Sequence, residues 1–358
     1  MGAALSTSWG AMPPIQDFFP PTPAVYTGMV TTFQLFPVFT VIQWGTSWYP
    51  AGKTSMTSSI FNLPGRLAWC IMEIVGPLNL VYNLSHSSPS FFELPAPNQL
   101  AAVLYCTHYL NRAIISPFFS APSMSPIHAF IMFSAMTFNW LNSSCISGWL
   151  SGLAIPVSGY QTDGTSAMDP SSFSFLLVQI LPFIGTILFS LGMAGNIYSE
   201  TELFRLRRDS AEQGSSKKSD TPTTTTVVSD SNGKDGNKFH KVYVIPPAEG
   251  VFRTILYPHY VFEWLEWVGF ALVGTAVFPL PGTNRVAPPL QAAPWILSAA
   301  WTADVLGIPL PLPAVLFAIN AVANMLPHAR WGRKWYVEKF GEKGVAGRGA
   351  VVPGCTWM

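Results

Sequence analysis

The sequence predicts an all-α, polytopic membrane protein with about seven transmembrane helices that enclose a cavity. Of its 358 residues, 49% are hydrophobic and only 10% are charged, and the mean hydropathy is +0.32. Soluble domains carry roughly 25% charged residues, because charged side chains keep a large surface in water. Apolar runs of about the 20 residues that a bilayer requires recur along the chain. They cover residues 23–44, 66–84, 98–118, 127–153, 173–195, 260–280 and 292–326.

The runs divide the chain into five parts. Residues 1–22 form an N-terminal segment without the basic start and short apolar core of a cleavable signal, so we expect the first run to be retained. Residues 23–208 hold spans one to five. Residues 209–240 are rich in Ser, Thr, Lys, Asp and Gly, a composition typical of a disordered loop. Residues 241–345 hold the last two spans, and 346–358 form a tail.

The last apolar run is unusual because it contains several prolines. Pro309, Pro311 and Pro313 lie close together within it. Proline removes a backbone donor and breaks or kinks a helix. The run is therefore either a kinked span or a span joined to a re-entrant segment.

The distribution of Lys and Arg predicts the orientation. Eight of the 19 Lys and Arg lie between residues 205 and 241, and six lie between 330 and 348. Short basic segments stay on the cytosolic side of a membrane. With an odd number of spans, the 209–240 loop and the C-terminus are cytosolic. Residues 85–97 and 155–171, which lack Lys and Arg, fall on the far side, where Arg285 is an exception.

Charge and cysteine content argue against several other classes. A net charge of +1 gives no basic surface for a phosphate backbone, so we expect no nucleic-acid partner. The four cysteines show no CxxC spacing, which disfavours a disulfide framework and a thiolate zinc site, and we predict no metal centre.

Ionisable residues inside spans are the informative ones, since each costs about 2.5–3.5 kcal/mol or more at the bilayer centre unless it is paired or lines a cavity. The acids in this position are Glu73, Glu263, Glu266 and Asp304, and the clearest base is Arg112. Trp69 lies one helical turn before Glu73 and shares its face. Two acids as close as Glu263 and Glu266 require a polar partner.

Further polar groups cluster at helical spacing in the third, fifth and sixth runs. His108 and Tyr109 lie one turn before Arg112, and the Tyr109 hydroxyl, protonated at neutral pH, is suited to donate to a carbonyl oxygen that gains negative charge. Asn196 and Glu200 are one turn apart, and His259 and Glu263 can face the same cavity. Gly192 and Gly195 allow close approach to their backbone.

Several blocks that contain these residues resemble the steroid 5α-reductase family. They are RLAWCIMEI (66–74), HYLNRAIISPFF (108–119), GMAGNIYSETELFRLRR (192–208), YVIPPAEGVF (243–252), HYVFEWLEWVGFAL (259–272) and RKWYVEKFGE (333–342). The resemblance implies a membrane enzyme of the endoplasmic reticulum that uses NADPH to saturate a C=C bond conjugated to a ketone. It also accounts for the lack of a GxGxxG fingerprint, because the family holds its dinucleotide inside a helical bundle.

The resemblance also implies residue roles. Glu73 and Tyr109 match the pair that holds the substrate ketone. Residues matching the cofactor site and its surroundings are Trp69, Arg112, Asn196, Glu200, Arg207, Tyr243, His259, Glu263 and Tyr336. The chain departs from the family pattern at Met72, Glu200 and His259, where Gln, Asp and often Asn are usual, and at 331–333. The implied substrate is an apolar enone, a 3-oxo-4-ene steroid or similar terpenoid, that enters from the surrounding membrane lipid.

Three alternatives stay open at this stage. A very-long-chain enoyl-CoA reductase or polyprenol reductase would use related blocks. An integral membrane methyltransferase that uses S-adenosylmethionine would also account for the segment from Tyr257 to Glu263. A receptor or transporter would account for the number of spans but not for the clustering of Glu, Tyr, Asn and Arg.

Overall fold

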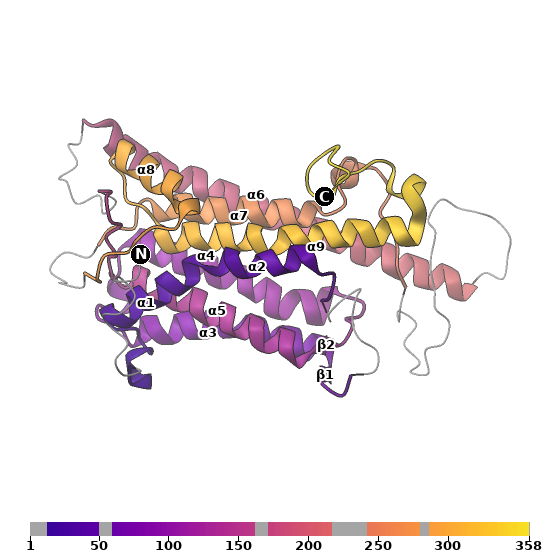
Figure 1. Cartoon of the computed structure of the whole chain (residues 1–358), viewed down its shortest axis with the longest axis horizontal. Coiled ribbons are helices and arrows are strands. Elements are labelled where there is room, and N and C mark those ends of the chain that lie inside the picture. The colour runs from indigo at the N-terminus through magenta and orange to yellow at the C-terminus, as the bar shows by residue number, and fades with distance from the viewer. Residues whose placement is uncertain (1–12, 50–58, 162–170, 217–241, 280–285, 358) are drawn as a thin grey trace.

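The helices of the protein form an elongated bundle in which most run lengthwise between two ends (Figure 1). The fold is described from a computed structural model and covers residues 13–49, 59–161, 171–216, 242–279 and 286–357. The helices are α1 (Pro23–Gln34), α2 (Phe36–Gly45), α3 (Gly65–Ser85), α4 (Ala96–Leu110), a π-helix (Asn111–Ser120), α5 (Ala129–Leu150), α6 (Phe173–Ser216), α7 (Pro258–Gly274), α8 (Leu297–Leu306) and α9 (Leu312–Val345). Short 3-10 helices cover Ile15–Asp17, Phe91–Glu93, Gly250–Phe252 and Pro294–Ile296.

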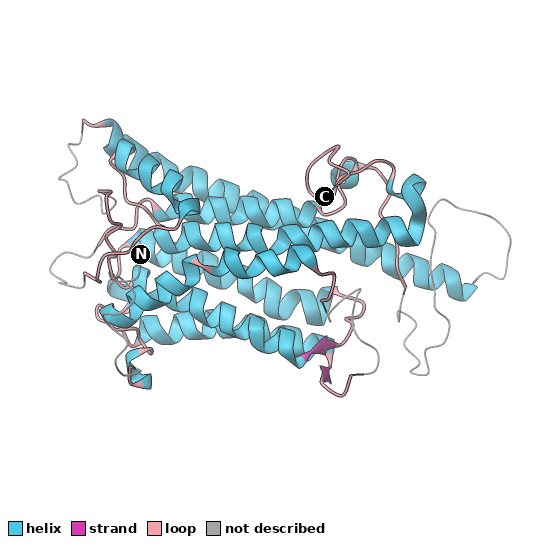
Figure 2. Cartoon of the chain, in the orientation of Figure 1, coloured by secondary structure: helices cyan, strands magenta, loops and turns pink. Residues whose placement is uncertain are grey.

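Strands contribute little to the described part of the chain (Figure 2). Strands β1 (Asn62–Leu63) and β2 (Ile127–His128) pair antiparallel, with Asn62 opposite His128. This short ribbon ties the start of α3 to the start of α5. The predicted all-α class is therefore confirmed.

Within the described residues, four helical segments are long and apolar enough to cross a membrane. They are Pro23–Gly45, Gly65–Ser85, Phe173–Glu212 and Leu312–Val345. Large apolar side chains such as Ile42, Phe133 and Phe183 are exposed on the outer faces of the helices, as a lipid environment requires. The protein is thus a polytopic helical membrane protein, and the count of seven spans stays a prediction.

The last apolar run is divided between two helices. Gly307 adopts a left-handed conformation at the end of α8, and α9 begins at Leu312 and continues to Val345. The break that the prolines predicted within 292–326 is therefore present, because the glycine ends one helix and the prolines after it start another. Asp304 lies near the end of α8, where its carboxylate accepts a hydrogen bond from the backbone of Gln161.

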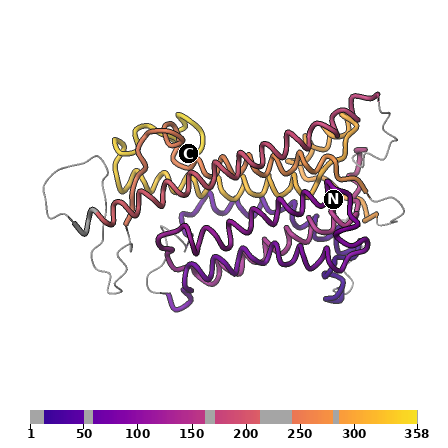
Figure 3. The backbone as a smooth tube through the Cα atoms, turned by 180° about the vertical axis from the view of Figure 1, so that it is seen from behind, coloured from indigo at the N-terminus to yellow at the C-terminus, as the bar shows by residue number. Residues whose placement is uncertain are grey.

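Two other boundaries differ from the prediction. Helix α6 continues to Ser216, so the first residues of the predicted 209–240 loop are helical, and 217–241 lie outside the described residues. The tail after Val345 packs against the segment before α7. Arg348 is buried there and donates hydrogen bonds to the carbonyl oxygens of Pro246 and Phe252. Figure 3 shows these two segments together at one end of the bundle.

Glycines bring α6 and α7 into close contact. A Cβ atom on Gly192 would lie 2.4 Å from the backbone nitrogen of Glu266, and one on Gly195 would lie 2.4 Å from the ring of Phe262. The close approach predicted at these two glycines is therefore made by α7. It places the polar residues of α6 beside those of α7.

Candidate functional site

A change of helix type positions the central base of the site. Helix α4 passes at Asn111 into a π-helix, a rare form that often occurs at functional sites because its wider turn redirects side chains. Arg66 holds the far end of the π-helix, where it donates to the carbonyl oxygens of Pro117 (2.7 Å) and Ala121 (2.8 Å). The indole of Trp69 donates to the carbonyl oxygen of Arg112 (3.0 Å), and the Arg112 guanidinium lies 4.8 Å from the Trp69 ring centre.

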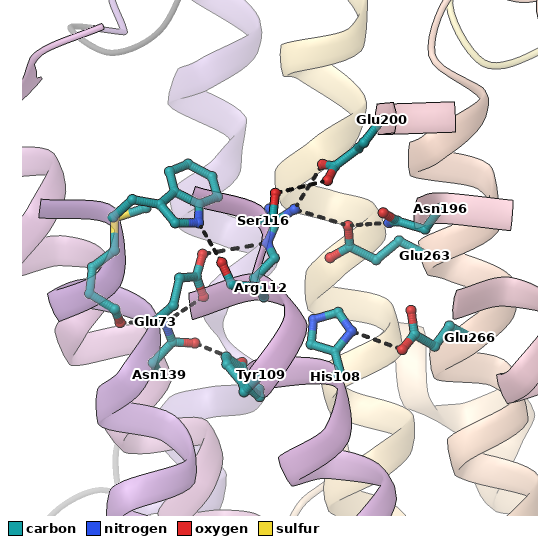
Figure 4. A network of polar contacts seen from close by, with 12 residues as sticks. Glu73, His108, Tyr109, Arg112, Ser116, Asn139, Asn196, Glu200, Glu263 and Glu266 are labelled. Atoms are coloured by element: carbon teal, nitrogen blue, oxygen red, sulfur yellow. Dashed lines mark hydrogen bonds and ion pairs between the residues drawn. The ribbon is translucent and has the colours of Figure 1, made fainter. Parts of the chain in front are cut away.

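Arg112 joins acids from three helices (Figure 4). Its Nε lies 3.6 Å from Glu73 Oε1 on α3, and its Nη1 lies 3.5 Å from Glu200 Oε1 on α6 and 3.8 Å from Glu263 Oε2 on α7. A guanidinium can meet several carboxylates at once because its donors fan out in one plane. When all are ionised, three carboxylates against one guanidinium leave the cluster acidic, so it favours an additional proton or cation.

Neutral groups complete the surroundings of two of these acids. The Ser116 hydroxyl donates to Glu200 (3.3 Å). The Asn196 amide donates both to Glu263 (3.2 Å) and to the carbonyl oxygen of His259 (3.2 Å). Asn196 is buried at the contact of α6 with α7, where the glycines bring the two helices together.

The predicted catalytic pair is linked through a third residue. The Tyr109 hydroxyl donates to Asn139 Oδ1 (2.8 Å), and Asn139 Nδ2 donates to Glu73 Oε2 (3.2 Å). All three side chains are buried. Glu73 therefore binds Arg112 through one oxygen and Asn139 through the other, so the Arg112 cluster and Tyr109 form one continuous network (Figure 4).

Glu266 has its own partner. His108 Nδ1 lies 2.8 Å from Glu266 Oε1, and both side chains are almost fully buried. The prediction that an acid at this position needs a polar partner is confirmed.

The remaining predicted residues form a second group near the ends of α6 and α9. Arg207 donates to the Ser123 hydroxyl (3.0 Å) and lies within electrostatic reach of Tyr243 and Tyr336. The Tyr243 ring packs against Trp335, with ring centres 4.9 Å apart. The predicted site residues thus fall into an inner group around Arg112 and an outer group around Arg207.

The sequence-based prediction did not include Asn139, Ser116 and Tyr49. Tyr49 and Tyr260 both lie within electrostatic reach of Arg112. Neutral amides and hydroxyls cost less than ionised groups in a membrane helix, so they stand out less clearly in an apolar run. A signal for Asn139 existed, since it is an amide inside a long apolar run.

Fold and site together define a helical membrane protein with a polar, ion-paired interior. Comparison with known proteins shows which family the chain is similar to. Residues 225–281 match the family model described as 3-oxo-5-alpha-steroid 4-dehydrogenase. The chain is 26% identical to steroid 5-alpha-reductase DET2 of Solanum lycopersicum, over 89% of this chain and 91% of that protein.

Other relatives cover a similar share of the chain. It is 26% identical to 3-oxo-5-alpha-steroid 4-dehydrogenase 1 of Bos taurus, over 81% of this chain and 82% of that protein. It is 28% identical to the uncharacterized protein C9.08c of Schizosaccharomyces pombe, over 85% and 90%. Over most of its length the chain is thus similar to steroid 5α-reductases, the family that its sequence blocks resemble.

Proposed function

We propose that the protein is a membrane-embedded, NADPH-dependent reductase that saturates the C=C bond of an α,β-unsaturated ketone. The substrate class is a 3-oxo-4-ene steroid or a similar apolar terpenoid enone. The observation that carries this proposal is the buried network in which Tyr109, Asn139 and Glu73 lead to Arg112. Relatives named as steroid reductases support the reaction type.

The residues of the inner group can polarise an enone. When the enone binds, the Tyr109 hydroxyl turns its single proton from Asn139 Oδ1 to the ketone oxygen. Glu73 donates a second hydrogen bond to that oxygen when it carries the additional proton that the acidic cluster favours. Negative charge that develops on the oxygen is stabilised by donors already in place, and the β-carbon becomes electrophilic. NADPH, when bound, supplies the hydride that this carbon accepts. A proton from solvent or from a side chain then completes the α-carbon.

The donor set fits a nicotinamide dinucleotide. The acidic excess around Arg112 suits a ring that becomes cationic when it gives up hydride, and the Asn196 amide beside Glu263 suits a carboxamide. Arg207 and the phenols of Tyr243 and Tyr336 supply the cationic and neutral donors that phosphate groups require. We therefore assign the inner group, with Trp69, Glu200 and His259, to the nicotinamide end and the outer group to the phosphate end.

The setting of the site agrees with an apolar substrate. The bundle exposes large apolar side chains on its outer faces, so an enone dissolved in lipid can reach it from the bilayer. We assign the protein to the endoplasmic reticulum membrane, with the C-terminus and the 209–240 segment in the cytosol.

Membranes that contain the protein test the proposal directly. They are incubated with NADPH and, in separate reactions, with progesterone as a 3-oxo-4-ene steroid and with a long-chain enoyl-CoA, and products are identified by mass spectrometry. We expect the steroid to gain two hydrogens and the thioester to remain. Reduction of the thioester alone, or methyl transfer from S-adenosylmethionine without NADPH consumption, would contradict the proposal.

Variants of the catalytic pair locate the reaction. Glu73→Gln and Tyr109→Phe each lose turnover by about 10²- to 10⁴-fold, the range for groups that donate or accept protons at a reacting centre. Asp304→Asn is the control, because Asp304 binds the backbone of Gln161 near the end of α8. Full turnover by both variants at normal membrane levels would overturn the assignment of the pair.

A further inference from the structure

We infer that Asn139 is a positioning residue for the catalytic pair, a role that rests on the proposed function. Asn139 lies on α5, whereas Glu73 and Tyr109 lie on α3 and α4. Its amide is the one group that contacts both side chains through hydrogen bonds in the close-up of the site (Figure 4).

Both N–H groups of the Asn139 amide have hydrogen-bond partners. Nδ2 donates one N–H to the carbonyl oxygen of Met72 (2.7 Å) and the other to Glu73 Oε2 (3.2 Å). Oδ1 accepts from the Tyr109 hydroxyl (2.8 Å). Asn139 is only 4% exposed, so water does not compete for these bonds.

The Met72 carbonyl fixes which way the amide points. With the amide turned over, Oδ1 would face the Met72 carbonyl and the Glu73 carboxylate, both of which only accept hydrogen bonds when Glu73 is ionised. The turned amide would also present its N–H groups to Tyr109 and lose the acceptor of the phenol proton. The backbone of α3 therefore selects the orientation in which Asn139 holds both side chains in the substrate-free site.

Asn139 therefore helps to hold both catalytic side chains in defined positions. Arg112 attracts Glu73 Oε1 at 3.6 Å, and Asn139 retains Oε2. Without Asn139, the Glu73 carboxylate is free to turn toward the guanidinium. The Tyr109 side chain also loses the partner that holds its hydroxyl beside Glu73 until the ketone oxygen accepts the phenol proton. Displacement of a reacting group by about 1 Å can cost about 100-fold in rate.

A purely structural amide in the same helix contact provides a control. Asn79 on α3 is also buried and donates to the hydroxyls of Ser143 and Ser144 on α5. It joins the same two helices as Asn139, but these hydrogen bonds do not involve the catalytic pair. Asn79→Ala therefore reports the cost of losing an amide between α3 and α5.

The experiment measures NADPH-dependent reduction of progesterone in membranes, normalised to inserted protein. Asn139→Ala should lower kcat about 10- to 100-fold with a much smaller change in KM, whereas Asn79→Ala should keep kcat within about 3-fold of wild type. In the Tyr109→Phe background, Asn139→Ala should have little further effect on kcat, because residues that act through one another are not additive.

Asn139→Leu keeps the test decisive if the alanine variant inserts poorly, since leucine has a similar size and no polar atoms. The kcat of Asn139→Leu should fall as that of Asn139→Ala does. Unchanged kcat in an inserted Asn139 variant, the same loss in Asn79→Ala, or full additivity with Tyr109→Phe would overturn the positioning role. An active wild type with unchanged Asn139 variants overturns this inference alone, whereas a wild type that reduces no enone overturns the proposed function as well.

Discussion

At the scale of single residues, Arg112 determines how the interior accommodates its charge. Glu73, Glu200 and Glu263 come from three different helices and share one guanidinium, each with an oxygen at 3.5–3.8 Å. These distances are longer than those of ideal charge-assisted hydrogen bonds, as expected when three acids share one guanidinium.

Replacing Arg112 by lysine tests this shared contact. The ammonium group of lysine is a compact charge and cannot contact three carboxylates as the planar guanidinium does. Arg112→Lys should therefore lower the free energy of unfolding by about 2 kcal/mol. The midpoint of thermal unfolding in detergent should fall by about 4 °C or more. Arg205→Lys is the matched control, because Arg205 is 58% exposed in its pair with Glu202 and should lose less than about 1 kcal/mol. Equal midpoints for the two variants would contradict the role of Arg112.

The sequence predicted the charged members of this site but not the neutral ones. Glu73, Arg112 and Glu263 were recognisable because an ionised group inside an apolar run is costly and needs a reason. Asn139 was visible as an amide in an apolar run, but it is uncharged and shares its helix with Asn142 and several hydroxyls. Its position between Glu73 and Tyr109 was needed to single it out.

At the scale of elements, the contact of α6 with α7 aligns the two acidic faces of the site. Gly192 allows the backbone of α6 to touch that of α7, and Asn196, one turn later, then reaches Glu263. A larger residue would separate the helices and lengthen this hydrogen bond.

Gly192→Ala tests the contact. Its Cβ would lie 2.4 Å from the nitrogen of Glu266 and 2.6 Å from the carbonyl oxygen of Phe262, both backbone atoms that cannot turn aside. Overpacking of this kind costs about 1–3 kcal/mol, so the unfolding midpoint should fall. Gly45→Ala should be nearly neutral, since a Cβ there meets nothing within 4 Å. A Gly192→Ala midpoint equal to that of wild type would show that the two helices can separate without cost.

Most helices were predictable as apolar runs, whereas their interruptions were not. The π-helix at Asn111–Ser120 leaves no hydrophobic pattern of its own, and the end of α8 depends on the left-handed conformation of Gly307. Both features arise from tertiary contacts and local backbone geometry. The glycine and the prolines that follow it marked a break without giving its form.

At the scale of the whole molecule, the basic residues gather at one end of the bundle. The start of α3, with Arg66, and the ends of α6 and α9 lie at the same end in Figure 1, whereas the connection that contains Phe91–Glu93 lies at the other. This arrangement agrees with a single cytosolic face, as the positive-inside rule requires.

Topology in intact microsomes checks the orientation. A C-terminal tag should be removed by added protease, and a glycosylation acceptor inserted after Ser90 should be modified. Asn83 begins the sequence Asn-Leu-Ser, which is a native N-glycosylation sequon. It should stay unmodified, because it is 1% exposed and donates to Ser147 on α5. A protected C-terminal tag together with an unmodified acceptor would reverse the orientation.

The most direct test of the central claim follows hydrogen through the reaction. Membranes that contain the protein are given progesterone and NADPH deuterated at the transferable position of the nicotinamide ring, and the product is analysed by mass spectrometry and NMR. We predict one deuterium at the β-carbon of the former enone and hydrogen from solvent at the α-carbon, with the signal lost in Glu73→Gln. A reduced product without deuterium, or with deuterium at the α-carbon, would contradict hydride transfer to an enone polarised by Glu73 and Tyr109.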